Sequence, residues 1–263
     1  MNFDNIISQV KEIAVSTGNF INNERSKFNI SDKETKGKHN FVTYVDKESE
    51  KRIIENLHKV LPVAGFIAEE GTSQKRHKDF NWVIDPLDGT TNFIHGMPPF
   101  AISIALLHKN KPILGVIYEI GLKECFSAHI ESKAYLNNNE IKVSEINYVK
   151  DSLIATGFPY TDFSRLDKFF ETMNYFMRNS HGLRRLGSAA TDLAYVACGR
   201  CDAFYEYGLN PWDVAAGCVL IEQAGGMISD FKGKNNYIFG GDILASNYNI
   251  YDEMVSIIID IMN

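Results

Sequence analysis

The chain has 263 residues, of which 44% are hydrophobic and 23% charged, and this balance excludes disordered and fibrous proteins. A net charge of −6 and a pI of about 5.7 argue against a general nucleic-acid binder, which usually carries a basic surface. The longest apolar run, residues 100–107, is too short to cross a bilayer, and the charged N-terminus does not resemble a signal peptide. We therefore expect a cytoplasmic protein with no nucleic-acid or membrane partner, whose four cysteines are reduced thiols.

The N-terminal half predicts two amphipathic helices and then a series of strands. Apolar residues recur at three- and four-residue steps from Phe3 to Ile21, and again from Ile53 to Val60. The polar residues 29–40 between them predict a mobile loop, and residues 41–45 predict a short strand or turn. Strands are predicted over residues 65–68, 82–84, 100–107, 113–118 and 124–128, followed by a hairpin through 137–139. Because these strands follow one another without helices between them, we expect an antiparallel sheet.

The C-terminal half changes to an alternation of strands and helices, which indicates an α/β arrangement. The predicted strands or extended segments are 153–156, 183–186 and 203–205, and the predicted helices are 163–178, 189–197, 214–224 and 248–262. The sequence therefore predicts an N-terminal α+β half over residues 1–140 and a C-terminal α/β half over 141–263. We expect the two halves, with a soft boundary, to form one functional unit.

Acidic residues follow the ends of hydrophobic segments at four places. They are Asp46, the pair Glu69-Glu70, the pair Asp85 and Asp88, and Asp213 after Trp212. A carboxylate at the end of a buried strand lies at the rim of its sheet, where binding sites are often built. Each also has a simpler interpretation: a β-turn for residues 85–89, a solvated strand end for Glu69-Glu70, and helix caps for Asp46 and Asp213. Their combination in one chain favours a functional site.

The segment that begins at Asp85 carries the most chemistry. Pro86 disfavours a helix at Asp85, and Asp88 lies three residues further on, so both carboxylates and the Leu87 carbonyl can converge across a turn. Oxygen ligands of this kind suit a hard cation such as Mg²⁺. Residues 89–91 resemble the start of a helix, whose free N–H groups attract phosphate. One segment therefore offers metal ligands and an anion site side by side.

Two long segments resemble the signatures of the inositol monophosphatase family. They are WVIDPLDGTTNFIH at residues 82–95 and WDVAAGCVLIEQAGG at residues 212–226, with Glu69-Glu70 and residues 187–190 at the expected intervals. The resemblance covers essentially the whole chain. It implies the layered α-β-α-β-α sandwich, of mixed α+β and α/β class, that inositol monophosphatases share with fructose-1,6-bisphosphatases. It also implies Mg²⁺-dependent, Li⁺-sensitive hydrolysis of phosphate monoesters and a homodimer.

The resemblance also implies a role for each matching residue, with two to three Mg²⁺ ions per site. The first ion would be held by Glu69, Asp85 and the Leu87 carbonyl, the second by Asp85, Asp88 and Asp213, and Glu69 would help to place a third through water. Thr90 and Asp46 would orient the nucleophilic water. The N–H groups of Gly89 and Thr90 would bind phosphate, and Ala189 and Glu206 would contact the polyol. Only one of Glu69 and Glu70 should face the metals, because successive strand residues point to opposite faces.

The substrate that the resemblance favours is myo-inositol monophosphate, a small phosphorylated metabolite. Hydrolysis of the 2′-phosphate of NADP(H) or of fructose 1,6-bisphosphate, as a sole or a second activity, is the alternative, because the catalytic residues do not separate these substrates. Residues 157–160 and Arg184-Arg185 resemble bacterial inositol monophosphatases more than phosphatases of nucleotides such as 3′-phosphoadenosine 5′-phosphate. Crowded carboxylates would repel one another without metal, so we expect Mg²⁺ to raise thermal stability. The polar loop at residues 29–40 is either a plain solvated loop or a segment that closes over substrate, bringing Lys36 or Lys38 to the phosphate.

Two rival functions are less well supported than a phosphatase of this family, and two other motifs have structural interpretations. A haloacid-dehalogenase-like phosphatase would space its aspartates by two residues, whereas Asp85 and Asp88 are three apart. A non-catalytic binding protein of the same fold should have lost metal ligands, and all are present. Cys198-Gly-Arg-Cys201 predicts structural thiols, because no second pair exists for a zinc site. Arg184-Arg185 predicts a surface or subunit-interface pair, with contact to an acidic substrate as the alternative.

Overall fold

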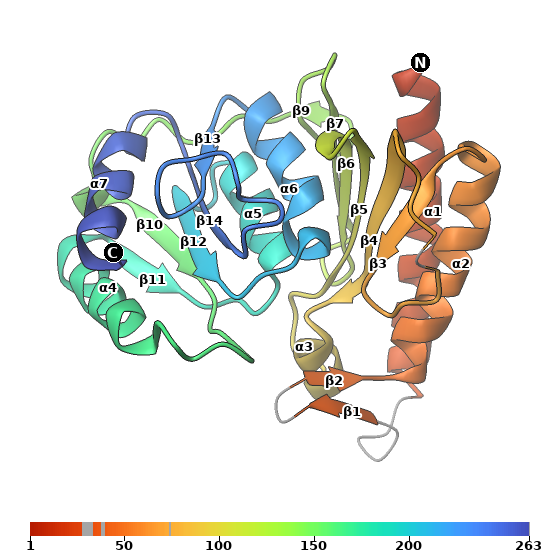
Figure 1. Cartoon of the computed structure of the whole chain (residues 1–263), viewed down its shortest axis with the longest axis horizontal. Coiled ribbons are helices and arrows are strands. Elements are labelled where there is room, and N and C mark those ends of the chain that lie inside the picture. The colour runs from red at the N-terminus through yellow and green to blue at the C-terminus, as the bar shows by residue number, and fades with distance from the viewer. Residues whose placement is uncertain (28–33, 38–39, 74, 263) are drawn as a thin grey trace.

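The computed structural model has five layers of helices and sheets (Figure 1). It describes residues 1–27, 34–37, 40–73 and 75–262. One outer layer holds α1 (Phe3–Arg25) and α2 (Tyr44–Val60), the central layer α5 (Ala189–Ala197) and α6 (Pro211–Gln223), and the other outer layer α4 (Leu166–Asn179) and α7 (Tyr251–Met262). A sheet lies between each pair of helical layers, so the predicted α-β-α-β-α sandwich is confirmed.

The first sheet, within the described residues, has seven strands that follow the chain in order. They are β3 (Gly65–Ala68), β4 (Phe80–Asp88), β5 (Ala101–His108), β6 (Lys111–Glu119), β7 (Glu124–His129), β8 (Tyr135–Leu136) and β9 (Asn139–Glu140). All neighbours are antiparallel, as expected, except the parallel pair β3–β4. The register of β4 against β5 shifts between Asp85 and Asp88, where Pro86 has no N–H for the ladder. The two aspartates therefore lie within an irregular strand and not in a turn beyond it.

The second sheet is mixed and has the strand order β11-β10-β12-β14-β13. Its strands are β10 (Leu153–Thr156), β11 (Gly182–Arg184), β12 (Ala203–Tyr207), β13 (Met227–Ser229) and β14 (Asp242–Ser246). The first three are parallel, and β14 runs antiparallel to both β12 and β13. Strands β13 and β14 were not predicted from the sequence, because both depend on pairing within the sheet and not on a local pattern.

Several element boundaries differ from the prediction in ways that affect the candidate site. Residues 41–45 do not form one strand: α2 begins at Tyr44, and Asp46 is in its first turn. Part of the predicted polar loop forms the hairpin of β1 (Glu34–Gly37) and β2 (Asn40–Val42). Helix α6 begins at Pro211, so Asp213 is in its first turn as well. The predicted short helix after Gly89 is α3 (Thr90–His95).

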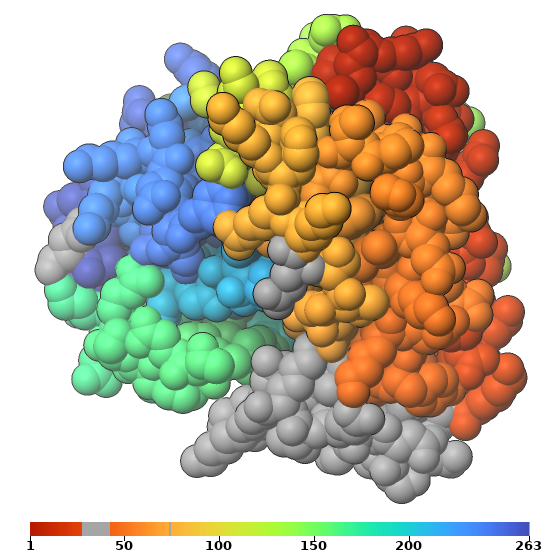
Figure 2. Space-filling view, turned by 45° about the vertical axis from the view of Figure 1, so that its right-hand side comes forward, coloured from red at the N-terminus to blue at the C-terminus, as the bar shows by residue number. Residues whose placement is uncertain are grey.

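The central helices join the two sheets through one continuous core. Figure 2 shows the N-terminal part (red to yellow) and the C-terminal part (green to blue) in contact along a seam. The core cluster at this seam contains Val83 and Phe126 from the first sheet, Leu193 and Val219 from the central helices, and Ile243 from the second sheet. The division of the chain near residue 140 stays a prediction, but its two sides are packed together. Among the described residues, no helix has both the length and the apolar character needed to cross a membrane.

Close packing of α6 against β6 leads to a test of this layered core. A Cβ at Gly115 would overlap the backbone of Ala216. We expect Gly115→Ala to lower the free energy of unfolding by about 1–3 kcal/mol, because neither backbone can move without disturbing its layer. Denaturant unfolding measures this change. Lys111→Ala, at an exposed position of the same strand, is the control and should change stability by less than about 0.5 kcal/mol. Equal stabilities of the two variants would contradict the close contact.

Candidate active site

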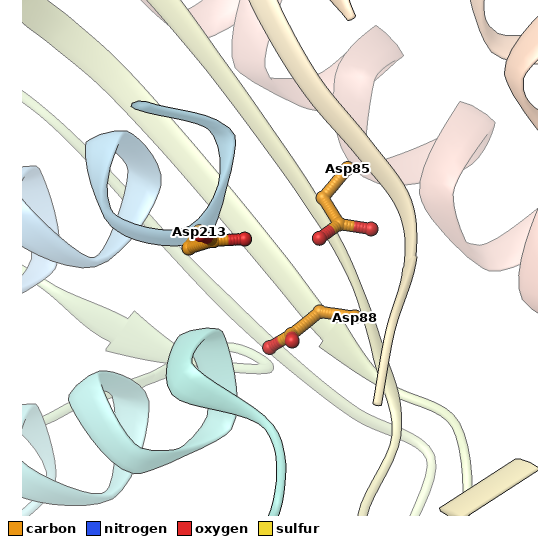
Figure 3. A group of neighbouring side chains, drawn as sticks. All are labelled: Asp85, Asp88 and Asp213. Carbon is orange, nitrogen blue, oxygen red and sulfur yellow. The ribbon is translucent and has the colours of Figure 1, made fainter. Parts of the chain in front are cut away.

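Three aspartates from two distant parts of the chain converge on one point at the seam. Asp85 and Asp88 come from β4, and Asp213 comes from the first turn of α6. One carboxylate oxygen of each lies within 4.8 Å of the others (Figure 3). The cluster offers only oxygen ligands, and this donor set fits a hard cation such as Mg²⁺.

Asp88 is held by the start of helix α5. Its Oδ2 accepts hydrogen bonds from the Ser188 hydroxyl at 2.6 Å and from the Ala190 N–H at 2.7 Å. Ser188 is the N-cap of α5, so Asp88 lies where the partial positive charge of the helix terminus favours an anion. The sequence analysis did not assign this role to Ser188, because the two residues are 100 positions apart.

Local backbone contacts hold the other two carboxylates. Asp85 Oδ1 accepts a hydrogen bond from the Leu87 N–H at 2.9 Å. Asp213 Oδ2 accepts one from the Asn210 N–H at 2.6 Å, in a capping box at the start of α6. The helix-capping interpretation of Asp213 is therefore correct. It does not exclude a metal ligand, since a carboxylate has a second oxygen.

The electrostatics of the cluster explain why it would take up a cation. Burial raises the pKa of Asp88 to about 6, although the hydrogen bonds from Ser188 and Ala190 oppose the shift. Burial and then the charges of neighbouring carboxylates raise the pKa values of Asp85 and Asp213 well above their usual range. Without a cation, these like charges destabilise the ionised site.

Glu69, and not Glu70, lies at this site. Glu69 lines the same pocket as the three aspartates, and its charge raises the pKa of Asp85. The segment after β3 is fixed by Glu50, a fully buried residue of α2 that was not predicted. Its carboxylate accepts hydrogen bonds from the N–H groups of Glu70 and Thr72, both at 2.7 Å. The expectation that only one member of the pair faces the cluster agrees with this arrangement.

Asp46 and Thr90 lie in direct contact beside the cluster. The Thr90 hydroxyl donates to Asp46 Oδ1 at 3.0 Å, or alternatively to the Leu87 carbonyl at 3.1 Å. Asp46 Oδ2 accepts hydrogen bonds from the N–H and hydroxyl of Thr43, which is the N-cap of α2. Asp46, like Asp213, therefore caps its helix from the third position of a capping box, while the N-cap itself is Thr43. Burial raises its pKa.

The carboxylates open into a pocket of about 160 Å³. Its further lining includes Gly89, Ala189 and Glu206, the positions that the resemblance assigns to phosphate and polyol. Burial raises the pKa of Glu206 to about 8. Glu206 lies directly against Gly157, where a Cβ would overlap the carboxylate.

Arg185 belongs to this pocket and is not a surface residue remote from it. It lines the cavity, and its charge opposes the rise in the pKa values of Asp88 and Glu206. Its guanidinium lies over the rings of Phe158 and Tyr160 and donates to the Tyr160 hydroxyl. Arg185 is thus a half-exposed residue of the pocket wall, and its place at a subunit interface stays a prediction. Arg184, by contrast, is exposed.

Another residue missed from the sequence connects the helix after β4 to the start of α5. The Asn92 side chain donates to the carbonyls of Pro99 at 2.7 Å and Leu186 at 2.8 Å. It thereby fixes the segment between β11 and Gly187, which leads to Ser188. Its position within the first signature was the available signal, but only the fold shows its partners.

Two sequence interpretations outside the carboxylate cluster have different outcomes. Lys38, and the side chain of Lys36, lie outside the described residues, so contact of either with phosphate stays a prediction. Cys198 and Cys201 are free thiols, and burial raises the pKa of each. A raised pKa disfavours the reactive thiolate, in agreement with a structural role.

Comparisons with known proteins agree with the fold. A model of the inositol monophosphatase family matches residues 3–261. The chain is 41% identical over 222 residues to the Nus factor SuhB of Escherichia coli, covering 84% of this chain and 83% of that one. Two solved structures are similar, each with 34% identity. The extragenic suppressor protein suhB of Bartonella henselae has a TM-score of 0.90 and 98% of both chains covered. An IMPase of Thermotoga maritima has a TM-score of 0.86 and 95% of both chains covered.

Mg²⁺ binding at the carboxylate cluster can be tested without an activity assay. We expect Mg²⁺ at ten times its dissociation constant to raise the melting temperature by about 3–5 °C, because the ion binds the folded chain. Asp213→Asn should melt higher than the wild type without Mg²⁺, since it removes one repelling charge, and should respond less to the ion. Thermal unfolding across a Mg²⁺ titration measures both effects. Glu131→Gln, an exposed change, should behave as the wild type, and a wild type that millimolar Mg²⁺ does not stabilise would refute the site.

Proposed function

The chain belongs to the inositol monophosphatase family, and from this premise we propose that it hydrolyses myo-inositol monophosphate to inositol and phosphate with Mg²⁺. Family membership supports a phosphatase of this type, and the substrate is the proposed part. The observation that carries the proposal is the convergence of Asp85, Asp88 and Asp213 beside a pocket that Glu206 also lines. Hydrolysis needs the carboxylate cluster, and recognition of a polyol needs hydrogen-bonding groups next to it.

The proposed metal ligands follow the resemblance. Glu69, Asp85 and the Leu87 carbonyl would hold one Mg²⁺, and Asp85, Asp88 and Asp213 a second, with Glu69 helping to place a third. When bound, Mg²⁺ supplies charge neutralisation on the phosphate and lowers the pKa of water. The chain's own part is to keep the carboxylates in position before a cation arrives, and the contacts of Asp88 with Ser188 and Ala190 do this.

Thr90 and Asp46 would orient the attacking water. A hydroxyl has one hydrogen, and when Thr90 gives it to Asp46 Oδ1, the Thr90 oxygen can accept a hydrogen bond from water. Thr43 in turn holds the Asp46 carboxylate, so the group that accepts the Thr90 hydrogen bond does not rotate. The water molecule, which uses a hydrogen for its bond to Thr90, can then direct a lone pair at the phosphorus atom. The backbone N–H groups of Gly89 and Thr90 are the proposed phosphate contacts, and Ala189 and Glu206 the proposed contacts of the alcohol.

Other phosphate monoesters remain candidates for the same chemistry. NADP(H) and fructose 1,6-bisphosphate are alternative or additional substrates, since none of the proposed metal ligands distinguishes them. The relatives' name offers a second function, that of a Nus factor, and so the expected lack of a nucleic-acid partner has no support from the comparisons. No feature of the described residues favours that function over hydrolysis. The homodimer and the sensitivity to Li⁺ stay predictions of the resemblance.

Phosphate release from four substrates tests the proposed function. We expect the purified protein with Mg²⁺ to hydrolyse inositol 1-phosphate faster than NADP, fructose 1,6-bisphosphate or 3′-phosphoadenosine 5′-phosphate. Asp88→Asn should reduce turnover by at least about 100-fold, because it weakens a proposed ligand at the centre of the cluster. Asp151→Asn, at an exposed position, is the matched control. Hydrolysis of one of the other substrates alone would support the proposed reaction and refute inositol monophosphate as its substrate. Phosphate release that does not depend on Asp88 would refute both the proposed reaction and the proposed substrate.

The water-orienting role of Thr90 has a separate test. Thr90→Val keeps the shape of the side chain and removes its hydroxyl, so we expect kcat to fall by about 100-fold while KM changes little. Thr90→Ser retains the hydroxyl and should keep most of kcat. Steady-state kinetics on inositol 1-phosphate distinguish the two variants. Comparable kcat values for Val and Ser at this position would show that the contact with Asp46 is not used in catalysis.

A further inference from the structure

Asp192 is a buried carboxyl group of the pocket to which neither the sequence nor the proposed reaction assigns a role. It lies on α5, one turn after Ser188, and only 1% of it is exposed. It lines the same pocket as Glu206 and Arg185. Its Oδ1 is buried and has no hydrogen-bond partner among the residues that the structure describes.

The surroundings of Asp192 make this arrangement unfavourable for the folded chain alone. Burial raises its pKa most, and the charges of Glu206 and Asp88 raise it further. Arg185 only partly compensates, because its guanidinium stacks on Phe158 and Tyr160 and donates to the Tyr160 hydroxyl. A buried polar atom without a partner lowers stability, so its presence needs an explanation.

A purely structural aspartate in the same half looks different. Asp202 is also buried, but both of its oxygens are satisfied: Oδ1 by the Ser144 hydroxyl and Oδ2 by the Leu153 N–H. Asp202 thereby links three segments: its own, the segment that contains Ser144, and the start of β10 at Leu153. Asp192 makes no comparable link, although it is more deeply buried. Most of the other buried polar atoms without a partner lie outside the pocket lining, whereas Asp192 lines the pocket, where a bound molecule can supply a partner.

We propose that Asp192 is a specificity-determining residue that, together with Glu206, hydrogen-bonds neighbouring hydroxyl groups on the alcohol part of the substrate. The inference rests on the proposed function, since it concerns the leaving group of the same reaction. A hydroxyl can donate to a carboxylate or accept from a carboxylic acid, so it can satisfy either form of Asp192. The pocket would then select polyhydroxylated alcohols over leaving groups without hydroxyls, whose binding would leave two buried carboxyl groups unpaired.

The test compares two substrates that share the phosphate and differ in the alcohol. Inositol 1-phosphate carries hydroxyls next to the ester, whereas p-nitrophenyl phosphate carries none. We expect Asp192→Leu, similar in size but unable to hydrogen-bond, to reduce the ratio of kcat/KM for these substrates by about tenfold, mainly through KM for inositol 1-phosphate. Asp192→Asn retains hydrogen-bonding atoms and should give a smaller decrease.

Asp202→Asn is the matched control, since it also changes a buried aspartate but lies outside the pocket lining. It should lower the melting temperature and leave the substrate ratio unchanged, whereas Asp192→Leu should melt at or above the wild-type temperature. A lower melting temperature for Asp192→Leu with an unchanged ratio, or an equal loss on both substrates, would overturn the proposal. A wild type that hydrolyses neither substrate would instead overturn the proposed function, and the inference about Asp192 with it.

Discussion

The mutual repulsion of buried carboxylates at the seam is the constraint on which the rest of the structure depends. Asp85, Asp88 and Asp213 are held close together by hydrogen bonds, and their raised pKa values reflect the cost of ionising them in one place. Two of the contacts that hold them come from across the seam, where the start of α5 donates twice to Asp88. The central helices therefore do more than fill the space between two sheets. Their N-termini point at the carboxylates, and small residues on both sides allow α6 to approach the first sheet closely, as where Ala216 of α6 meets Gly115 of β6.

Helix capping and proposed chemistry use the same side chains at this site. Asp46 and Asp213 each occupy the third position of a capping box, and each commits one oxygen to its own helix start. The other oxygen of Asp46 accepts from Thr90, and Asp213 still places a carboxylate oxygen within 4.8 Å of those of Asp85 and Asp88. A cap fixes a carboxylate more rigidly than a mobile loop would. The structural and functional interpretations of these residues are therefore compatible, although the sequence presents them as alternatives.

The sequence predicts well the features that depend on neighbouring residues. The helix Ala189–Ala197 and the strand Gly65–Ala68 follow from local periodicity, and the residues around Asp85 are contiguous. It predicts poorly what depends on tertiary contacts: β14 exists because it pairs with β12, and the start of α2 depends on the Thr43 cap. Ser188, Asn92 and Glu50 were missed for the same reason, since each acts on a residue or backbone segment far away in the chain.

The pocket has two acidic parts whose charges are compensated by different means. At Asp85, Asp88 and Asp213 the donors are oxygens alone, so a cation relieves their repulsion whatever alcohol is attached to the phosphate. Around Glu206 and Asp192, Arg185 is the cation that lines the described pocket, and it is partly occupied by Tyr160. Burial raises the pKa values of both carboxyl groups, and under the proposal for Asp192 the alcohol of the substrate supplies the hydrogen bonds that they lack. The proposed reaction and the proposed choice of alcohol therefore depend on separate sets of residues, so on this proposal a phosphatase of this fold could change its substrate without changing its chemistry.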